Sequence, residues 1–127
     1  MRFIFAISFF LLFNKLDADI NLTPILENLN KPWSVTLINE KKLLITEKSG
    51  NIILFDQSEK FIKKIKHNLK VLEHGQGGLL DILFKNKKVY VSYAENRGDG
   101  KSSTSVAVAK FNEDNLKFVN IFQSQPP

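Results

Sequence analysis

The 127-residue sequence contains no cysteine and only two histidines, His67 and His74. Without cysteine the protein cannot form disulfides, zinc–thiolate sites or a thiol nucleophile. Neither histidine has a serine or aspartate partner at an interpretable spacing, so no catalytic triad is predicted. We expect His67, within the lysine-rich stretch KKIKHNLK, to be a solvated surface residue, and His74 to belong to a loop.

Long hydrophobic runs are also scarce, and the only extended one comprises the eleven residues from Phe3 to Phe13. A helix needs about 20 apolar residues to span a bilayer, and a basic residue followed by a shorter run is typical of a secretory signal peptide. We expect residues 1–18 to be that peptide; a buried N-terminal element is the alternative. The mature chain, residues 19–127, would then have no transmembrane segment and be secreted or periplasmic.

The charge pattern does not favour nucleic-acid binding, although the formal net charge is +5. Nucleic-acid-binding proteins gather basic residues on one face, with aromatic residues among them. Here the lysines are scattered in pairs between apolar runs, where lysine also discourages the association of exposed sheet edges. We therefore expect no nucleic-acid partner.

No segment after residue 30 shows a sustained amphipathic helical period. Instead, short apolar runs rich in β-branched and aromatic residues alternate with polar turns, which predicts antiparallel strands and an all-β fold. The predicted strands are SVTLI, KLLITE, NIILFD, FIKKIK, LLDILF, KVYVSYA, TSVAVAKF and LKFVNIF.

An internal repeat reduces the number of all-β folds that the sequence could adopt. TLINEKKLLITE, from Thr36, aligns with ILFKNKKVYVSY, from Ile82, at an offset of 46 residues. A period of about 40 to 50 residues with four short strands is typical of a β-propeller blade, although a β-sandwich with regular hairpins could give a similar pattern. Two blades cannot close a ring and would leave unpaired edges. We therefore expect a truncated sequence.

Two glycine-containing stretches are candidates for a site. GDGKSS, from Gly98 to Ser103, has no following helix to supply the donors of a phosphate cradle, so we interpret ENRGDGKSS as a long hairpin loop. The Arg-Gly-Asp that it contains is no evidence of adhesion. In HGQGGLLD, the glycines either form only a tight connection or bring Gln76 against a ligand.

Several of these stretches together resemble the N-terminal part of the glucose/sorbosone dehydrogenase family. They are KPWSVTLINEKKLLITEKSGNIILFD, GQGGLLDILF, VYVSYAE, STSVAVAKF and IFQSQPP, in the family's order and at about its spacing. The resemblance covers residues 25–127. Its most specific pieces are Pro32-Trp33-Ser34, Thr46-Glu47 with Gly50, and the run from Gly75 to Asp81.

The resemblance implies an exported, soluble aldose dehydrogenase that uses pyrroloquinoline quinone (PQQ). It further implies a six-bladed propeller with PQQ over the central channel, a calcium ion at the quinone, and a histidine that acts as general base on the sugar. Sugar and an electron acceptor would be its partners. Gln76 matches the family's glutamine that faces the active site, and is the cofactor-binding residue we expect. Trp33 and Glu47 also match, but we assign them core packing and a strand-end hydrogen bond.

The family's catalytic histidine, its cationic cofactor contacts and its calcium ligands come later in the chain than the stretch that ends here at Pro127. We therefore expect no catalytic residue and no metal ligand in this chain, no stable cofactor binding, and no activity of the 127 residues alone. Two alternatives stay open: a secreted, non-enzymatic propeller that binds carbohydrate or protein, and a truncated product without a role of its own.

Overall fold

The computed structural model describes residues 20–125, which form strands and no helix, and therefore contain no helix that could cross a membrane. The predicted signal peptide, residues 1–18, lies outside the described residues. The strands are β1 (Pro32–Leu37), β2 (Lys42–Glu47), β3 (Ile52–Asp56), β4 (Phe61–His67), β5 (Leu79–Lys85), β6 (Lys88–Gly98), β7 (Lys101–Lys110), β8 (Asn115–Leu116) and β9 (Val119–Gln123).

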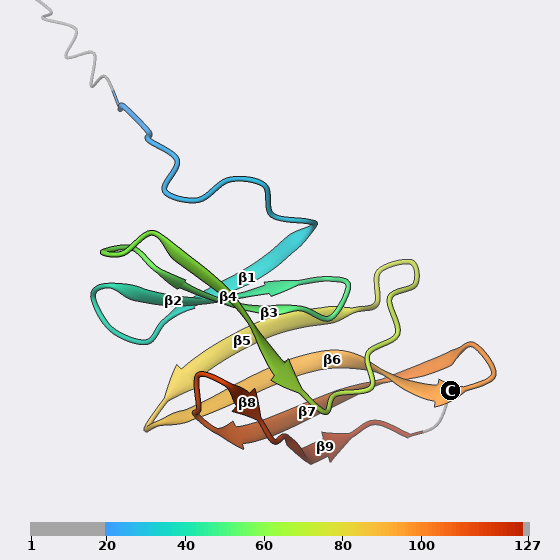
Figure 1. Cartoon of the computed structure of the whole chain (residues 1–127). Helices are drawn as coiled ribbons and strands as arrows, with labels where there is room; N and C mark the ends of the chain where they lie inside the picture. The colour runs from blue at the N-terminus through green and yellow to red at the C-terminus, as the bar shows by residue number, and fades with distance from the viewer. Residues whose placement is uncertain (1–19, 126–127) are drawn as a thin grey trace, which may run out of the picture.

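The strands form two sheets that lie one over the other (Figure 1). The first sheet has the order β1-β2-β3-β4-β8, and the second has the order β5-β6-β7-β9. Within each sheet four strands follow one another in antiparallel pairs, as in a propeller blade. The all-β, blade-like architecture predicted from the sequence is thus confirmed.

The internal repeat corresponds to equivalent strands of the two sheets. Strand β2 begins at Lys42 and β6 begins at Lys88, which is the offset of 46 residues seen in the sequence. Strands β1 and β5 are the first strands of their sheets, and the two lie against each other. The sheets therefore stack as successive copies of one unit.

Short polar side chains close the connections between strands, as the turn pattern predicted. The Asn39 side-chain oxygen accepts hydrogen bonds from the backbone N–H groups of Lys41 and Lys42, each at 2.9 Å. Asn112 accepts in the same way from two backbone N–H groups after β7. Between β5 and β6, Asn86 and Lys87 both have positive φ, the conformation that two-residue hairpin turns of type I′ require.

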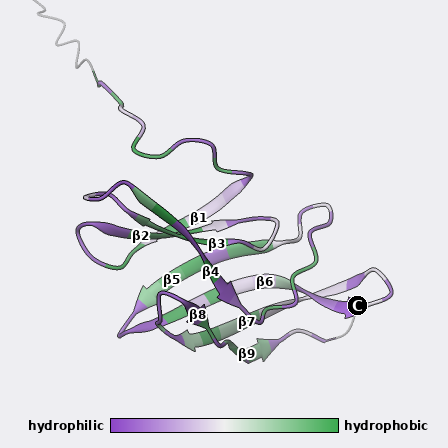
Figure 2. Ribbon diagram, in the orientation of Figure 1, coloured by the Kyte–Doolittle hydropathy of each residue, from purple (hydrophilic) through white to green (hydrophobic). Residues whose placement is uncertain are grey.

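The main core lies between the two sheets, whose strands carry stretches of hydrophobic residues, shown in green in Figure 2. From the first sheet it includes Leu44, Ile52, Leu54 and Ile65, and from the second Leu79, Ile82, Val89, Val91, Tyr93, Ala107 and Ala109. At about 25 cal/mol per Å² of buried apolar area, this layer is the main source of stability in a chain without disulfides.

A second, smaller cluster lies on the other face of the first sheet. It consists of Leu43, Ile45, Ile53 and Phe55, which alternate with the residues of the main core. Leu26 and Leu29, from the segment that precedes β1, pack against it. The N-terminal segment thus covers a face of the first sheet that would otherwise be open.

Three structural predictions were wrong in detail. ENRGDGKSS is not a long loop, because β6 and β7 continue to Gly98 and Lys101 and leave only a tight turn. LKFVNIF does not form one strand, because Leu116 ends β8 while β9 starts at Val119 in the other sheet. The first sheet is not four-stranded, because β8 adds to β4 in parallel.

Candidate functional site

The loop of residues 68–78 connects the last strand of the first repeat, β4, to the first strand of the second, β5. It runs along the end of β6: Leu72 N–H donates to the Ala94 carbonyl at 2.9 Å, and Asn96 N–H donates to the Lys70 carbonyl at 2.8 Å. The loop is therefore held to the second sheet by its backbone, although it contains no strand of its own.

Gln76 lies at the apex of this loop. The turn that carries it is closed by a 2.8 Å hydrogen bond from Gly77 N–H to the His74 carbonyl, and Gly75 has φ +54°. The Gln76 side chain is exposed, and within residues 20–125 its amide makes no hydrogen bond. The predicted site residue therefore stands on a fixed turn with one donor group and one acceptor group available.

Gly78, at the end of the loop that leads into β5, occupies a position that other residues do not fit. Its φ is +152°, and a Cβ added there would lie 2.4 Å from the carbonyl oxygen of Lys48. The same Lys48 carbonyl accepts a 3.0 Å hydrogen bond from Leu79 N–H. The close neighbour of this glycine is thus the backbone of the first sheet, and the glycine lets the loop pack tightly before β5 begins.

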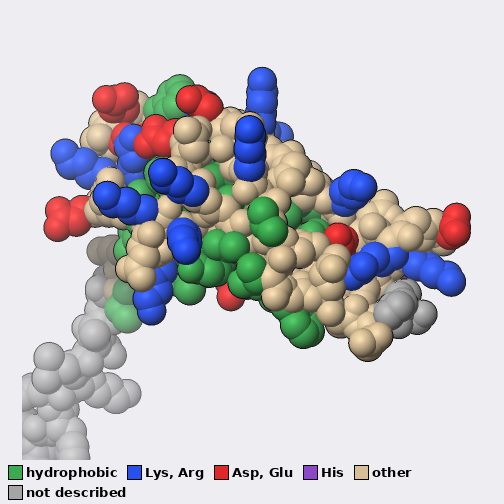
Figure 3. All heavy atoms as spheres, turned by 90° about the horizontal axis from the view of Figure 1, so that it is seen from below, with side chains coloured by type: hydrophobic (Ala, Val, Ile, Leu, Met, Phe, Trp, Pro, Cys, Tyr) green, Lys and Arg blue, Asp and Glu red, His purple; other side chains and the backbone are tan. Residues whose placement is uncertain are grey.

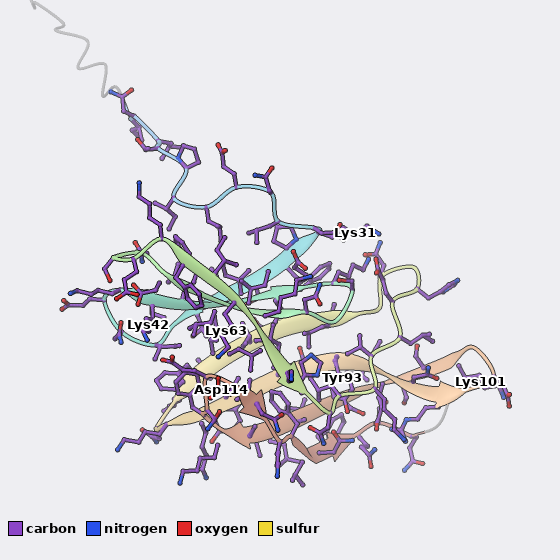
Figure 4. All side chains as sticks on the ribbon, viewed as in Figure 1. Lys31, Lys42, Lys63, Tyr93, Lys101 and Asp114 are labelled. Carbon is purple, nitrogen blue, oxygen red and sulfur yellow. The ribbon has the colours of Figure 1, made fainter. Side chains whose placement is uncertain are left out.

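Two lysines that flank strands of the first sheet, Lys31 before β1 and Lys48 after β2, hold the loop from the other side. The Lys48 ammonium donates to the Gly75 carbonyl at 2.6 Å and lies 5.7 Å from the centre of the Trp33 ring. Lys31, labelled at the start of β1 in Figure 4, pairs with Glu73 at 2.7 Å. The exposed Lys31–Glu73 ion pair contributes little to stability by itself. The Lys48 hydrogen bond, however, fixes the Gly75 carbonyl, one residue from Gln76.

The structure confirms the role expected for Glu47 but not the one expected for Trp33. Glu47 is buried and accepts hydrogen bonds of 2.6 Å from the Asn30 backbone and from the Asn51 amide, so a strand-end hydrogen bond was the right prediction. Trp33 is 49% exposed, so its predicted role in core packing was wrong. Its ring instead supports the ammonium of Lys48.

His67 is not the solvated surface residue that we expected. Its Nε2 lies 2.7 Å from the Gly50 carbonyl, and its Nδ1 accepts a hydrogen bond from Leu69 N–H at 3.2 Å. The ring also meets Phe118 edge to face. His67 is therefore a structural residue with a polar neighbour at each ring nitrogen. His74 is an exposed loop residue, as predicted.

A half-buried carboxylate that sequence analysis missed lies near the same end of β6. Glu95 accepts hydrogen bonds from Ser105, Gln123 and Asn120 at 2.6, 2.8 and 3.1 Å, and Arg97 lies 3.1 Å away. Burial alone would raise the pKa of Glu95, but these donors and the Arg97 charge outweigh it and lower that pKa. The alternation Val91, Tyr93, Glu95 was the available indication that this carboxylate faces inward.

Tyr93, labelled in Figure 4, extends this network by donating to the Asn120 side-chain oxygen at 2.8 Å. Burial raises the pKa of its hydroxyl. Since the donors and acceptors satisfy one another, the cluster joins β6, β7 and β9 and is a structural element. Among residues 20–125, no group of three histidine, aspartate or glutamate side chains is placed to hold a metal ion.

The two stacked, antiparallel sheets with a glycine-rich connection between them define a segment of an all-β propeller. The chain belongs to the glucose/sorbosone dehydrogenase family, whose model matches residues 29–127. The family predicted from the sequence is thus confirmed.

Known proteins agree with this assignment. The chain is 26% identical over 118 residues to the aldose sugar dehydrogenase YliI of Escherichia coli (strain K12), and the match covers 86% of this chain and 32% of that protein. A solved structure of a glucose dehydrogenase is 34% identical with a TM-score of 0.75, and the match covers 82% of this chain and 33% of that one.

The PQQ-bound form of an aldose sugar dehydrogenase from Streptomyces coelicolor has the same fold, with a TM-score of 0.69 at 19% identity. That match covers 83% of this chain and 34% of the other. The chain thus spans about a third of the length of the relatives that it matches.

Proposed function

We propose that this chain is the N-terminal part of an exported, PQQ-dependent aldose dehydrogenase that oxidises the anomeric carbon of sugars. Residues 1–18 would be its signal peptide, and residues 19–127 the first two sheets of its propeller domain. Family membership supports the sugar substrate, and the PQQ-bound relative of the same fold supports the cofactor. An electron acceptor would be the second partner.

The observation that carries the proposal is the position of Gln76. Its amide is exposed and has no hydrogen-bond partner among residues 20–125, on a turn that Lys48 and the end of β6 hold in place. Its NH₂ group can donate to a quinone oxygen, and its carbonyl oxygen can accept from a sugar hydroxyl. The residues present therefore fit a cofactor contact, and we assign that contact to Gln76.

PQQ, when bound, would supply the electron-pair acceptor for hydride removed from the sugar. The contribution of this chain is orientation: Gln76 would fix an oxygen of the cofactor, while the tight approach of Gly78 to Lys48 keeps the turn from moving. We propose that the general base and the calcium ligands belong to residues beyond Pro127. The 127 residues alone would then bind PQQ weakly and be inactive.

The test is to isolate the longest natural polypeptide that begins with this sequence and to assay it with an aldose and an artificial electron acceptor. We expect oxidation only when both PQQ and calcium are supplied. Sugar binding without oxidation under those conditions would support the alternative of a non-enzymatic propeller. Oxidation of sugar by the purified 127 residues alone would contradict the proposal.

A further inference from the structure

Three lysines form a row across one end of the second sheet. Cross-strand pairing places Lys85 beside Lys88, and Lys88 beside Lys110, and all three side chains are exposed. The row lies where β5 and β7 end and β6 begins, at the opposite end of the sheet from the Gln76 loop, which leads into the start of β5. Figure 3 views the second sheet from its outer side and shows Lys and Arg side chains clustered toward the left end. We name these three residues the lysine row.

The lysine row carries charge that the described chain does not neutralise. Like charges directly opposite each other destabilise a pair of strands, and the row contains two such pairs in succession. Among the ion pairs of residues 20–125, none involves a lysine of the row. An anion bound at this end of the sheet would remove the repulsion.

The equivalent position in the first sheet has the acids that the lysine row lacks. At the repeat offset of 46 residues, Lys88 corresponds to Lys42, whose cross-strand partner is Asp56. The Lys42 ammonium lies 3.9 Å from the Asp56 carboxylate and 2.8 Å from that of Glu113. The hydrogen bond to Glu113 raises the pKa of Lys42, because it stabilises the charged ammonium. In the second sheet Lys110 takes the place of the aspartate.

A hollow of about 380 Å³ adjoins the lysine row at Lys110. One of its walls is apolar, because the half-buried ring of Phe111 meets Phe84 edge to face at 5.3 Å. No acidic residue belongs to the lining, which consists of Lys110, Phe111, Asn112, Asn115 and Lys117.

The polar groups that remain available in the hollow are mainly donors. The side-chain oxygen of Asn112 already accepts from two backbone N–H groups of its own turn, at 2.8 and 3.1 Å, so this residue offers its NH₂ group. The acids of the same turn are engaged elsewhere, since Glu113 and Asp114 pair with lysines of the first sheet (Figure 4). The hollow therefore presents two ammonium groups and side-chain amides without a carboxylate.

This donor set suits a phosphate group. Lysine binds phosphate as a point charge, and phosphate oxygens accept strong, charge-assisted hydrogen bonds. The hollow is far larger than the roughly 30 Å³ that one water molecule occupies in the liquid, so it has room for an organic group beside the phosphate. The ring of Phe111 would contact the carbon part of such a ligand.

We propose that the hollow and the lysine row form a binding site for the phosphate group of an organic phosphate. Lys110 and Lys117 contact the phosphate oxygens, Asn112 donates a further hydrogen bond, and the other lysines of the row contribute charge. The same group occurs in free phosphate esters and in the headgroups of anionic lipids. The inference goes beyond the proposed function and does not depend on it.

The test protein is a fusion in which residues 20–127 replace the matched region of the E. coli aldose sugar dehydrogenase, so that the rest of a propeller is present. Isothermal titration calorimetry measures the Kd for glycerol phosphate, with glycerol as the uncharged control ligand. The variants are Lys110→Gln and Lys117→Gln. The matched control is Lys101→Gln, which removes the same charge at the other end of β7 (Figure 4).

We expect the fusion to bind glycerol phosphate and not glycerol. Lys110→Gln and Lys117→Gln should each raise the Kd about tenfold, the effect of losing a hydrogen bond from a charged group, and Lys101→Gln should leave it unchanged. A fusion that does not bind glycerol phosphate would overturn the proposal. So would equal weakening by Lys101→Gln and Lys110→Gln, because binding would then follow net charge and not the site.

A further variant separates loss of the site from loss of the fold. Lys110→Asp gives Lys88 the partner that Lys42 has in the first sheet. It should abolish binding of glycerol phosphate while raising the unfolding temperature of the fusion by about 1 to 2 °C, because a like-charge pair becomes an ion pair. A Lys110→Asp variant that binds as tightly as the parent would place the phosphate elsewhere and overturn the proposal.

Vesicle flotation distinguishes the two sources of the phosphate group. Flotation of the fusion with phosphatidylglycerol vesicles but not with phosphatidylcholine vesicles, lost in Lys110→Gln, would assign the site to a lipid headgroup. Binding of glycerol phosphate without flotation would assign it to a free phosphate ester. Sugar oxidation is not measured, so failure of the proposed function leaves these outcomes unaffected.

Discussion

Gly78 is the residue at which the candidate loop and the first sheet come closest. Replacement by alanine places a Cβ against the Lys48 carbonyl at a φ of +152°. We expect Gly78→Ala to cost about 2 to 4 kcal/mol, from strain and overlap together. Gly100→Ala, at a φ of +73° with open space around it, should cost only about 1 kcal/mol.

Urea unfolding of both glycine variants measures this difference. If both variants lost the same free energy of unfolding, the positive φ alone would account for the loss. The close approach of residue 78 to the Lys48 carbonyl would then add nothing.

Glu95 should make stability depend on acid pH. Its carboxyl pKa is lowered in the folded protein by hydrogen bonds and by Arg97, so it binds a proton less readily when folded than when unfolded. Its contribution is therefore complete above an unfolded pKa of about 4.3 and is lost as the pH falls through the lower folded value. Glu95→Gln should cost about 1 to 3 kcal/mol at pH 7.

Thermal unfolding of the parent and of Glu95→Gln at pH 7 and at pH 3 checks this effect. The gap between the two proteins should narrow at pH 3. A gap that stays constant across this range would mean that the charge of Glu95 does not stabilise the fold.

At the scale of elements, the apolar strands were predictable because their side chains alternate between two buried or half-buried faces. The far end of β6 and the start of β7 could not be predicted in this way, because Asn96, Arg97 and Ser103 are polar. These residues form strands only because β6 and β7 pair with each other across the hairpin. Likewise, His67 lies in a lysine-rich stretch, and its half-buried position depends on its contact with Gly50, which is 17 positions away in the sequence.

The sequence was enough to predict the turn of the candidate loop, but not the contacts that hold the loop in place. The glycines around Gln76 indicated a tight turn, and the structure confirms one. The role of Lys48 could not be inferred, since the lysine and Gly75 are 27 positions apart and meet only once the sheets stack. Long-range contacts of this kind leave no local pattern.

Lys48→Met tests whether this lysine fixes the loop. Removing a charge-assisted hydrogen bond should raise amide hydrogen exchange of Gly77 about tenfold. Lys48→Arg should restore most of the protection, and Lys41→Met, an exposed lysine in the β1–β2 turn, should have no effect. Unchanged exchange in Lys48→Met would show that the backbone contacts of the loop suffice.

At the scale of the whole molecule, the two sheets form a stack that has a different face at each end. At one end Leu26 and Leu29 pack on the first sheet, and at the other end Leu83, Val119 and Phe122 of the second sheet are exposed. The chain spans about a third of the length of its relatives.

The central claim is that Gln76 contacts the cofactor of a sugar dehydrogenase. The most direct measurement uses a fusion in which residues 20–127 replace the matched region of the E. coli aldose sugar dehydrogenase. The Kd for PQQ is measured by equilibrium dialysis with calcium present, for this fusion and for its Gln76→Ala and Gln57→Ala variants. Gln57 lies in the β3–β4 turn, away from the candidate loop. We expect Gln76→Ala to raise the Kd about 5- to 20-fold, as loss of hydrogen bonds to a charged ligand would, and Gln57→Ala to leave it unchanged. A folded Gln76→Ala variant that binds PQQ as tightly as the parent would contradict the account.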